Sequence, residues 1–183
     1  MRPYYKPSNY SVRNSVGYLM RMSINRMLPQ MEALFVDAEL TFSQWTALVA
    51  LHSGVTTAGD LAHNICHDAG SLTRMIDQLA RRGFVTRDRS ASDRRVVTLG
   101  LTPHGEELVE VMAPKVMDLW NSLLAGFSHA EIDTLIALLT RLAIAVEGKP
   151  REGRVSLLTD AAPIPKIALP PKGAPKAVKG KTS

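Results

Sequence analysis

The chain has 183 residues, of which 45% are hydrophobic, so it is long enough for one domain with a sizeable core. No apolar run reaches the ~18 residues that a transmembrane helix needs, and the polar start MRPYYKPSNY lacks a signal-peptide core, so no membrane association is expected. A single cysteine, Cys66, permits no internal disulfide, which favours a cytoplasmic location.

The net charge of +5 is unevenly distributed along the chain. Residues 148–183 hold eight basic and two acidic residues, so the first 147 residues carry a net charge of −1. Within those 147, residues 68–95 hold seven arginines against four aspartates, and acidic segments flank them. This pattern predicts one positively charged face, formed by the middle of the chain.

The first half of the chain has a helical pattern. Residues 11–36 are apolar on more than one side, as at a subunit interface, and Pro29 predicts a kink or a break within them. Thr41 and Gln44 have the spacing of a capping box that opens a helix ending near Gly54. A short helix follows from Thr57.

Asp68 is a candidate N-cap for a third helix, which ends at Gly83. Residues 84–86 and 96–99 have the composition of β-strands, and a charged segment lies between them. This arrangement predicts a hairpin. Thr102-Pro103 opens a long helix, and the capping box formed by Ser128 and Glu131 opens a last helix to about Val146.

From Gly148 the composition changes, because six of the eleven prolines lie there together with Lys, Ala and Gly. Such a segment cannot bury enough apolar surface to offset its ordering entropy, so a disordered basic tail is expected. The tail either adds non-specific DNA affinity or only solubilises the protein.

The order of elements predicts a mainly α fold with a small β-wing, a winged helix-turn-helix joined to a helical dimerisation region. We divide the chain into an N-terminal arm with the first dimerisation helix (1–36), a DNA-binding lobe (37–101), C-terminal dimerisation helices (102–147) and the tail (148–183). The third helix of such a lobe enters the major groove.

The third helix is amphipathic: Leu72, Met75, Ile76 and Leu79 fall on one side, which packs inward. The outer face combines hydrogen-bond donors with small residues that permit close approach to DNA. Its candidate DNA-binding residues are Gly70, Ser71, Thr73, Arg74, Gln78 and Arg81. The alternative is an ordinary amphipathic surface helix, on which Arg and Gln are also common.

The hairpin tip favours the DNA-binding interpretation. Four of its six charged residues are arginines and none is lysine: Arg87, Arg89, Arg94 and Arg95, interspersed with Asp88 and Asp93. Arginine gains from the negative potential of a narrow minor groove, and Asp93 is placed to brace a neighbouring arginine. A solvated loop would explain a polar tip, but it would not explain why the basic residues are all arginine and none is lysine.

Four motifs, in this order, closely resemble the MarR family of regulators. They are Asp68-Ala69-Gly70-Ser71-Leu72-Thr73-Arg74-Met75-Ile76-Asp77-Gln78-Leu79, Arg82-Gly83-Phe84-Val85, Ser92-Asp93-Arg94-Arg95 and Leu101-Thr102-Pro103-His104-Gly105. The resemblance covers residues 11–147. It implies an obligate homodimer whose base is formed by the first and the last two helices, and whose winged lobes read a pseudo-palindrome.

The resemblance also implies roles for individual residues. Ser71, Thr73 and Arg74 would meet bases and phosphates, Arg94 would enter the minor groove, and Asp93 would brace it. Many relatives have lysine or another polar residue near the start of the third helix, where this chain has Ala69 and Gly70. Base readout from those two positions is therefore not implied.

Members of this family bind aromatic carboxylates or phenols between the lobe and the dimer base. By side-chain type and helix position, the candidate ligand-binding residues are Tyr18, Met22, Arg26, Trp45, His52 and Met112. Each of them is equally compatible with a place in the core.

The segment from His63 to His67 offers an alternative, because it groups two imidazoles with the Cys66 thiol. Metal sensing by His63 and His67, or redox sensing by Cys66, would use the same fold. The spacing matches no recognised zinc motif, so no metal or cofactor is expected.

No catalytic triad, glycine-rich phosphate loop or paired acidic motif occurs at a usable spacing, so an enzyme is not expected. The sequence predicts a MarR-type regulator at the bacterial nucleoid, most simply a repressor. Its expected partners are double-stranded DNA, a second copy of itself and a small aromatic or phenolic acid that releases it from the operator.

Overall fold

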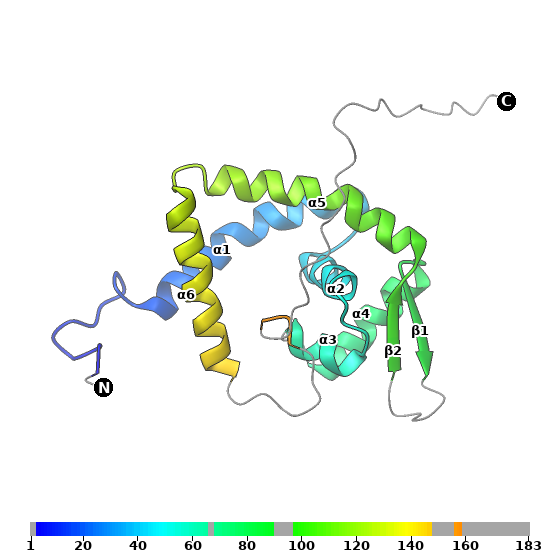
Figure 1. Cartoon of the computed structure of the whole chain (residues 1–183), viewed down its shortest axis with the longest axis horizontal. Helices are drawn as coiled ribbons and strands as arrows, with labels where there is room; N and C mark the ends of the chain where they lie inside the picture. Colours follow the sequence, from blue (N-terminus) through cyan, green and yellow to red (C-terminus); the bar gives the residue numbers. More distant parts are fainter. Residues whose placement is uncertain (1–2, 66–67, 90–96, 148–155, 159–183) are drawn as a thin grey trace.

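The computed structural model describes residues 3–65, 68–89, 97–147 and 156–158, and Figure 1 shows a lobe at one end of a frame of long helices. The frame consists of α1 (Val16–Phe35), α5 (Pro103–Leu123) and α6 (His129–Glu147). The lobe consists of α2 (Phe42–His52), α3 (Ala58–Asn64), α4 (Ala69–Arg81), β1 (Val85–Arg89) and β2 (Val97–Leu101), and the 3₁₀ turn η1 (Val36–Ala38) connects α1 to it. The predicted fold class is confirmed.

The core of the lobe forms around α2, which packs against α1, α3, α5 and β2. Its most completely buried side chains are Phe35, Leu48, Val55, Leu61, Leu79 and Val109. These residues come from α1, α2, α3, α4, α5 and the turn after α2, so a single apolar cluster holds the lobe to the two long helices. A shift of α1 or α5 is therefore transmitted directly to the lobe.

The helix starts follow the local signals in the sequence. Thr41 and Gln44 form a reciprocal capping box at α2, and the Thr102 hydroxyl accepts a hydrogen bond from the Gly105 amide at α5. One prediction was wrong in part: Pro29 does not break the first helix, because α1 continues to Phe35. Only one backbone hydrogen bond is lost at a proline, and packing against α2 and α5 stabilises the turns on either side.

The wing is an antiparallel hairpin in which Val85 pairs with Leu101 and Arg89 pairs with Val97. A short bridge between Thr57 and Thr98 adds the start of α3 to the outer edge of β2, and the Leu99 amide donates to the Thr56 carbonyl at 2.8 Å. The wing is thus hydrogen-bonded to the helix-turn-helix at its base.

The junction between the wing and α5 requires a glycine at position 105. A Cβ atom there would lie 2.2 Å from the Phe84 carbonyl oxygen, whereas at Gly126 nothing lies within 4 Å. We expect Gly105→Ala to lower the free energy of unfolding by about 1–3 kcal/mol, because α5 must move away from the backbone of Phe84, just before β1. Urea denaturation checks this against the control Gly126→Ala. Equal stability of the two variants would contradict the close approach.

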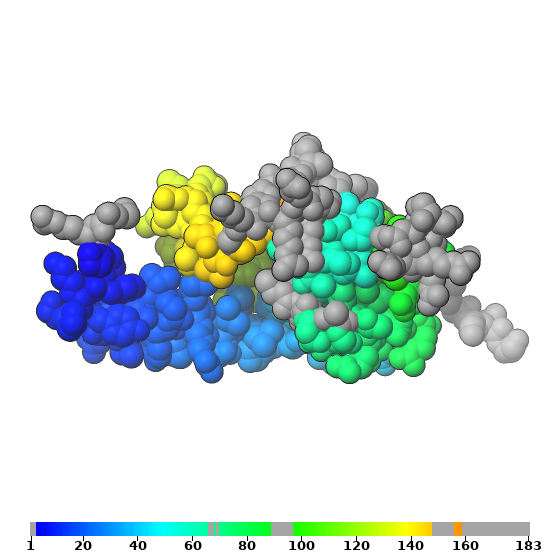
Figure 2. Space-filling model, turned by 90° about the horizontal axis from the view of Figure 1, so that it is seen from below, coloured from blue at the N-terminus to red at the C-terminus, as the bar shows by residue number. Residues whose placement is uncertain are grey.

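The frame leaves much apolar surface uncovered within one chain. None of the residues of α6 is buried, although the helix is rich in Leu, Ile and Ala. Figure 2 shows the N-terminal arm and α1, in blue, along one edge of the molecule, with the lobe at the opposite end. The exposed large apolar side chains of the frame include Val16, Leu19, Met20, Ile24, Leu28, Met117, Trp120, Leu123, Leu135, Ile136, Leu138 and Leu139. Within the described residues, no helix combines the length and hydrophobicity of a membrane span.

Three residues beyond α6 differ from the expected disordered tail. Ser156 is buried, and the Leu157 amide donates a hydrogen bond of 2.7 Å to Asn64 Oδ1 at the end of α3. Leu157 also packs against the core cluster. Apolar residues of this segment therefore find a surface on the lobe, which a composition argument does not foresee. The other residues of 148–183 lie outside the described part of the chain.

Candidate nucleic-acid interface

The N-terminus of α4 is held by Asp68. Its Oδ1 accepts hydrogen bonds from the Gly70 amide at 3.0 Å and the Ser71 amide at 2.9 Å, which fixes the first turn. The predicted N-cap is thereby confirmed. Because α4 begins at a charged cap, its first turn, with Gly70 and Ser71, has a defined orientation relative to the lobe.

The Asp68 cap makes a testable prediction about pH. Hydrogen bonds from the Ser71 amide and hydroxyl lower the pKa of Asp68 below its ordinary value of 3.8, with smaller contributions from Gly70 and Arg74. A lowered folded-state pKa adds stability above pH 3.8, and this stability is lost as the pH falls through the folded-state pKa. Asp68→Asn keeps a capping side chain but removes the charge.

We therefore expect the wild-type chain to exceed Asp68→Asn in free energy of unfolding by a constant amount near neutral pH. The difference should shrink below pH 3.8. Chemical denaturation of both proteins across this range measures it, and the contribution of Glu131, whose pKa is also lowered by hydrogen bonds from Ser128, cancels in the comparison. A difference independent of pH would mean that the Asp68 charge does not stabilise the cap.

The outer face of α4 presents a row of polar side chains, whereas Leu72, Ile76 and Leu79 are buried beneath it. Gly70, Thr73, Arg74, Gln78 and Arg81 are exposed and Ser71 is half-buried. Arg74 Nη2 donates to Ser71 Oγ at 3.3 Å, so these two side chains lie together near the start of the helix. The structure thus brings all six candidate residues of α4 onto one helix.

Gln78 and Arg81 lie farther along α4. The Gln78 Oε1 atom accepts a 3.0 Å hydrogen bond from Nε2 of Gln44, which is buried at the start of α2. Arg81 Nε donates to the backbone carbonyl of Asp77 at 3.3 Å. The sequence analysis assigned Gln44 only to its capping box, and no sequence signal indicates that the other end of its amide reaches α4.

The wing is connected to α4 by an ion pair. Arg87 Nη1 on β1 lies 2.6 Å from Asp77 Oδ1, and both side chains are partly exposed. Arg87, which is expected to contact DNA, thus also links β1 of the wing to α4. Asp77 was not among the predicted site residues. Arg89 is the last residue of β1. The other candidates of the wing, Asp93, Arg94 and Arg95, lie outside the described residues.

A second arginine has a structural role that the sequence analysis missed. Arg82 donates to the carbonyl oxygens of Ala38, at 2.7 Å, and Glu39, and its guanidinium lies 4.9 Å from the centroid of the Phe84 ring. It therefore fixes the end of α4 against the turn that follows α1. Arg82 thus faces the lobe, whereas Arg74 and Arg81 are exposed on α4.

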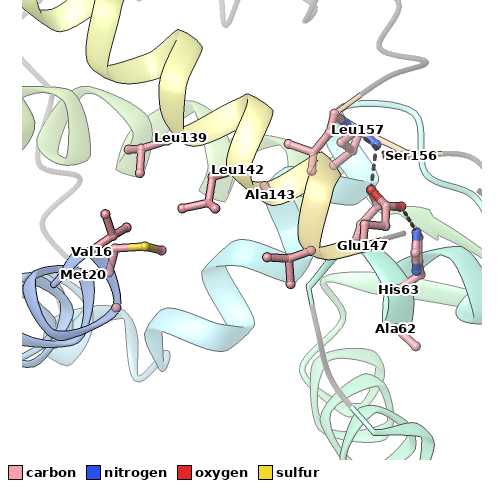
Figure 3. Close-up of a pocket in the computed structure, with 14 residues that line it drawn as sticks. Val16, Met20, Ala62, His63, Leu139, Leu142, Ala143, Glu147, Ser156 and Leu157 are labelled. Atoms are coloured by element: carbon pink, nitrogen blue, oxygen red, sulfur yellow. Dashed lines mark hydrogen bonds and ion pairs between the residues drawn. The ribbon is translucent and has the colours of Figure 1, made fainter. Parts of the chain in front are cut away.

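A cavity of about 1050 Å³ lies between the lobe and the frame. In Figure 3, Val16 and Met20 of α1 face Leu139 and Leu142 of α6 across it. At one end His63 Nε2 of α3 is hydrogen-bonded to Glu147 Oε1 of α6, and Asn64 lies beside this pair. The cavity is apolar apart from this end, and it joins α3 of the lobe to two helices of the frame.

The six predicted ligand-binding residues lie elsewhere and none of them lines this cavity. Trp45 and Met112 are buried in the core cluster. His52 Nδ1 is paired with Glu106 Oε2 at 2.6 Å, and its Nε2 is buried without a hydrogen-bond partner among the described residues. Tyr18 and Arg26 are exposed on α1, and Met22 is half-buried there. Ligand binding by these six residues stays a prediction.

The predicted sensing cluster is only partly visible. His63 is engaged by Glu147, as described above, while Cys66 and His67 lie outside the described residues. The structure therefore does not bring the three residues into one site that can be assessed, and thiol or metal sensing stays a prediction.

Comparison with known proteins agrees with this geometry. The MarR family profile matches residues 40–97, which include α2, α3, α4 and β1 and end at the first residue of β2. A mutant of MarR from E. coli, crystallised with operator DNA, is 27% identical with a TM-score of 0.64, and the match covers 70% of this chain and 94% of that one. BpsR of Bordetella bronchiseptica, whose DNA binding is regulated by 6-hydroxynicotinic acid, is 28% identical with a TM-score of 0.64, over 70% and 98% of the two chains.

A third similar structure is NadR in complex with 4-hydroxyphenylacetate, which is 26% identical with a TM-score of 0.66, over 76% of this chain and 97% of that one. These relatives are matched over nearly their whole length, so the match extends beyond the winged lobe into the frame. MarR-family proteins are DNA-binding regulators rather than enzymes. The order of motifs, the winged lobe and these matches together show the fold of the MarR-type winged-helix transcriptional regulators, and residues 40–97 match the MarR family model.

Proposed function

We propose that this protein is a transcriptional repressor that binds a pseudo-palindromic operator as a homodimer and is released by a small aromatic acid. The observation that carries the proposal is the outer face of α4. It presents Ser71, Thr73 and Arg74 near a helix start fixed by Asp68. Hydroxyl and guanidinium groups at the start of a recognition helix are suited to base edges and phosphates.

The exposed apolar surface of the frame supports the homodimer. A helix that is apolar and has no buried residue in its own chain is stable in water only if something covers it. We propose that a second copy covers α6, together with the exposed side chains of α1 and α5. A symmetric pair places two copies of α4 at a fixed separation, which is the requirement for reading two half-sites.

Repression would be steric, because a dimer on the operator excludes polymerase. An effector relieves it only by binding one dimer conformation more tightly than the other. The core cluster joins the lobe to α1 and α5, so a change in the angle of these helices changes the separation of the two α4 helices.

The ligands of two relatives support an aromatic hydroxy acid as effector: 4-hydroxyphenylacetate for NadR and 6-hydroxynicotinic acid for BpsR. We propose that it binds at the end of the cavity beside His63 and Glu147, the part of the space between α1, α3 and α6 that the second copy leaves open. The apolar lining suits an aromatic ring, and a hydroxyl group could donate to the Glu147 carboxylate at the polar end. A ligand there contacts both the lobe and the frame.

The first test is DNA binding. Fluorescence anisotropy with duplexes from upstream of the protein's own gene should give saturable, salt-dependent binding at one dimer per site. Competitor DNA of random sequence should be at least ~1000-fold weaker. Binding no tighter than to the competitor would overturn the proposal.

The second test concerns the effector. Addition of 4-hydroxyphenylacetate or 6-hydroxynicotinic acid should release the bound duplex, with benzoate as a simpler acid for comparison. Leu142→Trp, which narrows the cavity, should abolish the response while preserving DNA binding, whereas Thr134→Trp, on the polar side of α6 and outside the cavity lining, should leave the response intact. If His52→Ala abolishes the response and Leu142→Trp does not, the effector binds among the six residues predicted from sequence.

Two further parts of the proposal have their own tests. The division at residues 36, 101 and 147 places all DNA contacts of the folded part in residues 37–101. If the basic tail also contacts DNA, truncation at Gly148 should reduce the salt dependence of DNA binding. Sensing by Cys66, the alternative, predicts that Cys66→Ser prevents release of DNA by peroxide.

A further inference from the structure

The amide of Gln78, on the outer face of α4, is held in one orientation by a relay that starts at a helix cap. The Thr41 amide donates to Gln44 Oε1 at 3.0 Å, and Gln44 Nε2 donates to Gln78 Oε1 at 3.0 Å. Gln44 is more than nine-tenths buried, at 8% exposed, so solvent does not compete for its amide. Gln78 itself is exposed.

The assignment of oxygen and nitrogen along this relay follows from chemistry. A backbone N–H can only donate, so the Gln44 atom that meets Thr41 is the oxygen. The nitrogen of Gln44 then faces α4, and because a nitrogen of an amide only donates, the Gln78 atom that meets it is the oxygen. Reversing either amide would set two donors or two acceptors against each other.

We propose that Gln44 is a positioning residue for DNA recognition, which turns the oxygen of Gln78 inward and leaves its NH₂ group as the only part directed at DNA. The two polar atoms of an amide diverge from one carbon, so an oxygen held against α2 does not face the groove together with the nitrogen. Gln78 therefore meets a hydrogen-bond acceptor, and it does not form the paired contact with adenine that glutamine makes elsewhere.

Two acceptors of DNA fit this chemistry: a phosphate oxygen, or an acceptor on a base edge in the major groove, which guanine, adenine and thymine offer and cytosine does not. The inference rests on the proposed function, because it assumes that α4 lies against DNA.

The test exchanges the donor at position 44 for an acceptor. Gln44→Glu retains the capping box, since a glutamate oxygen accepts from the Thr41 amide as well as glutamine does. Its other oxygen now requires a donor, so the Gln78 amide must rotate and present its oxygen to DNA. Melting temperatures of the variants establish that the lobe is folded.

The experiment is a selection of duplexes from a random pool, followed by affinities for the selected duplex of the wild type, Gln44→Glu, Gln78→Ala and the double variant. Gln78→Ala should weaken binding roughly three- to tenfold per half-site. Gln44→Glu should have a similar effect when Gln78 is present and less than about a twofold effect in the Gln78→Ala background. This dependence separates positioning of Gln78 from any general effect of the added negative charge.

The two possible acceptors give different results. If Gln78 meets a base, wild-type duplexes lack cytosine at one position per half-site, and Gln44→Glu shifts that position toward adenine or cytosine, which offer donors. If it meets a phosphate, affinity falls for all sequences alike with no change in the selected bases.

The proposal is overturned if Gln44→Glu weakens binding equally with and without Gln78, if Gln78→Ala leaves affinity unchanged, or if Gln78 selects for cytosine. Failure of the wild-type chain to select any duplex would overturn the proposed function instead, and this inference with it.

Discussion

Replacing Arg74 with alanine should weaken operator binding roughly 10- to 100-fold and leave the melting temperature of the protein unchanged. The guanidinium is exposed on the outer face of α4, where it donates a hydrogen bond to Ser71 at 3.3 Å. The lobe does not depend on it for stability, whereas a charged donor at the start of a recognition helix forms strong contacts with phosphates or guanine.

Anisotropy titrations at several salt concentrations measure this effect and identify the contact. Loss of a phosphate contact lowers the slope of log affinity against log salt by about one per half-site, whereas loss of a base contact relaxes the sequence preference at one position. Arg141→Ala is the matched control, because Arg141 is an exposed arginine on α6, away from the lobe. An equal loss of affinity in both variants would show that only net charge matters.

The second large effect is expected at the frame. The double variant Leu135→Glu, Leu139→Glu should be monomeric and should bind the operator roughly a hundredfold or more weaker, because each lobe then binds its half-site alone. Both side chains are exposed large hydrophobics, and they lie four residues apart on one side of α6. Two carboxylates there would have to be desolvated in a dimer.

Sedimentation velocity measures the oligomeric state, and circular dichroism checks that the lobe remains folded, as expected since no residue of α6 is buried within its own chain. Thr134→Glu serves as the control, because Thr134 lies on the polar side of α6 with Arg141, seven residues away. A double variant that remains dimeric at micromolar concentration would contradict the assignment of α6 to the dimer interface.

Local signals in the sequence determined the elements of the fold. Thr41 with Gln44, Asp68, and Ser128 with Glu131 each mark the start of a helix, because a side-chain oxygen needs only the amides two or three residues ahead. The wing could also be predicted from the sequence, because the change from a helical to a strand-like pattern after Gly83 is visible without knowledge of the rest of the chain.

Contacts between elements were not predicted. Gln44 and Gln78 are 34 residues apart, His63 and Glu147 are 84 apart, and Leu157 reaches Asn64 over 93. Asp77 and Arg87 are close in sequence but lie on different elements. Side-chain type left Trp45 and Met112 equally compatible with a ligand-binding role and with the core, and both are buried in the core cluster. Composition cannot separate these environments, because aromatic and thioether side chains suit both.

The sequence by itself determined the order of helices, the charged wing and the polar face of α4, because each follows from periodicity or from a cap within a few residues. Only the tertiary structure decided how that face is presented: which amide atom of Gln78 turns inward, which aspartate holds Arg87, and where a cavity opens between lobe and frame. These depend on distances between elements, which are set when the core of the lobe closes around α2.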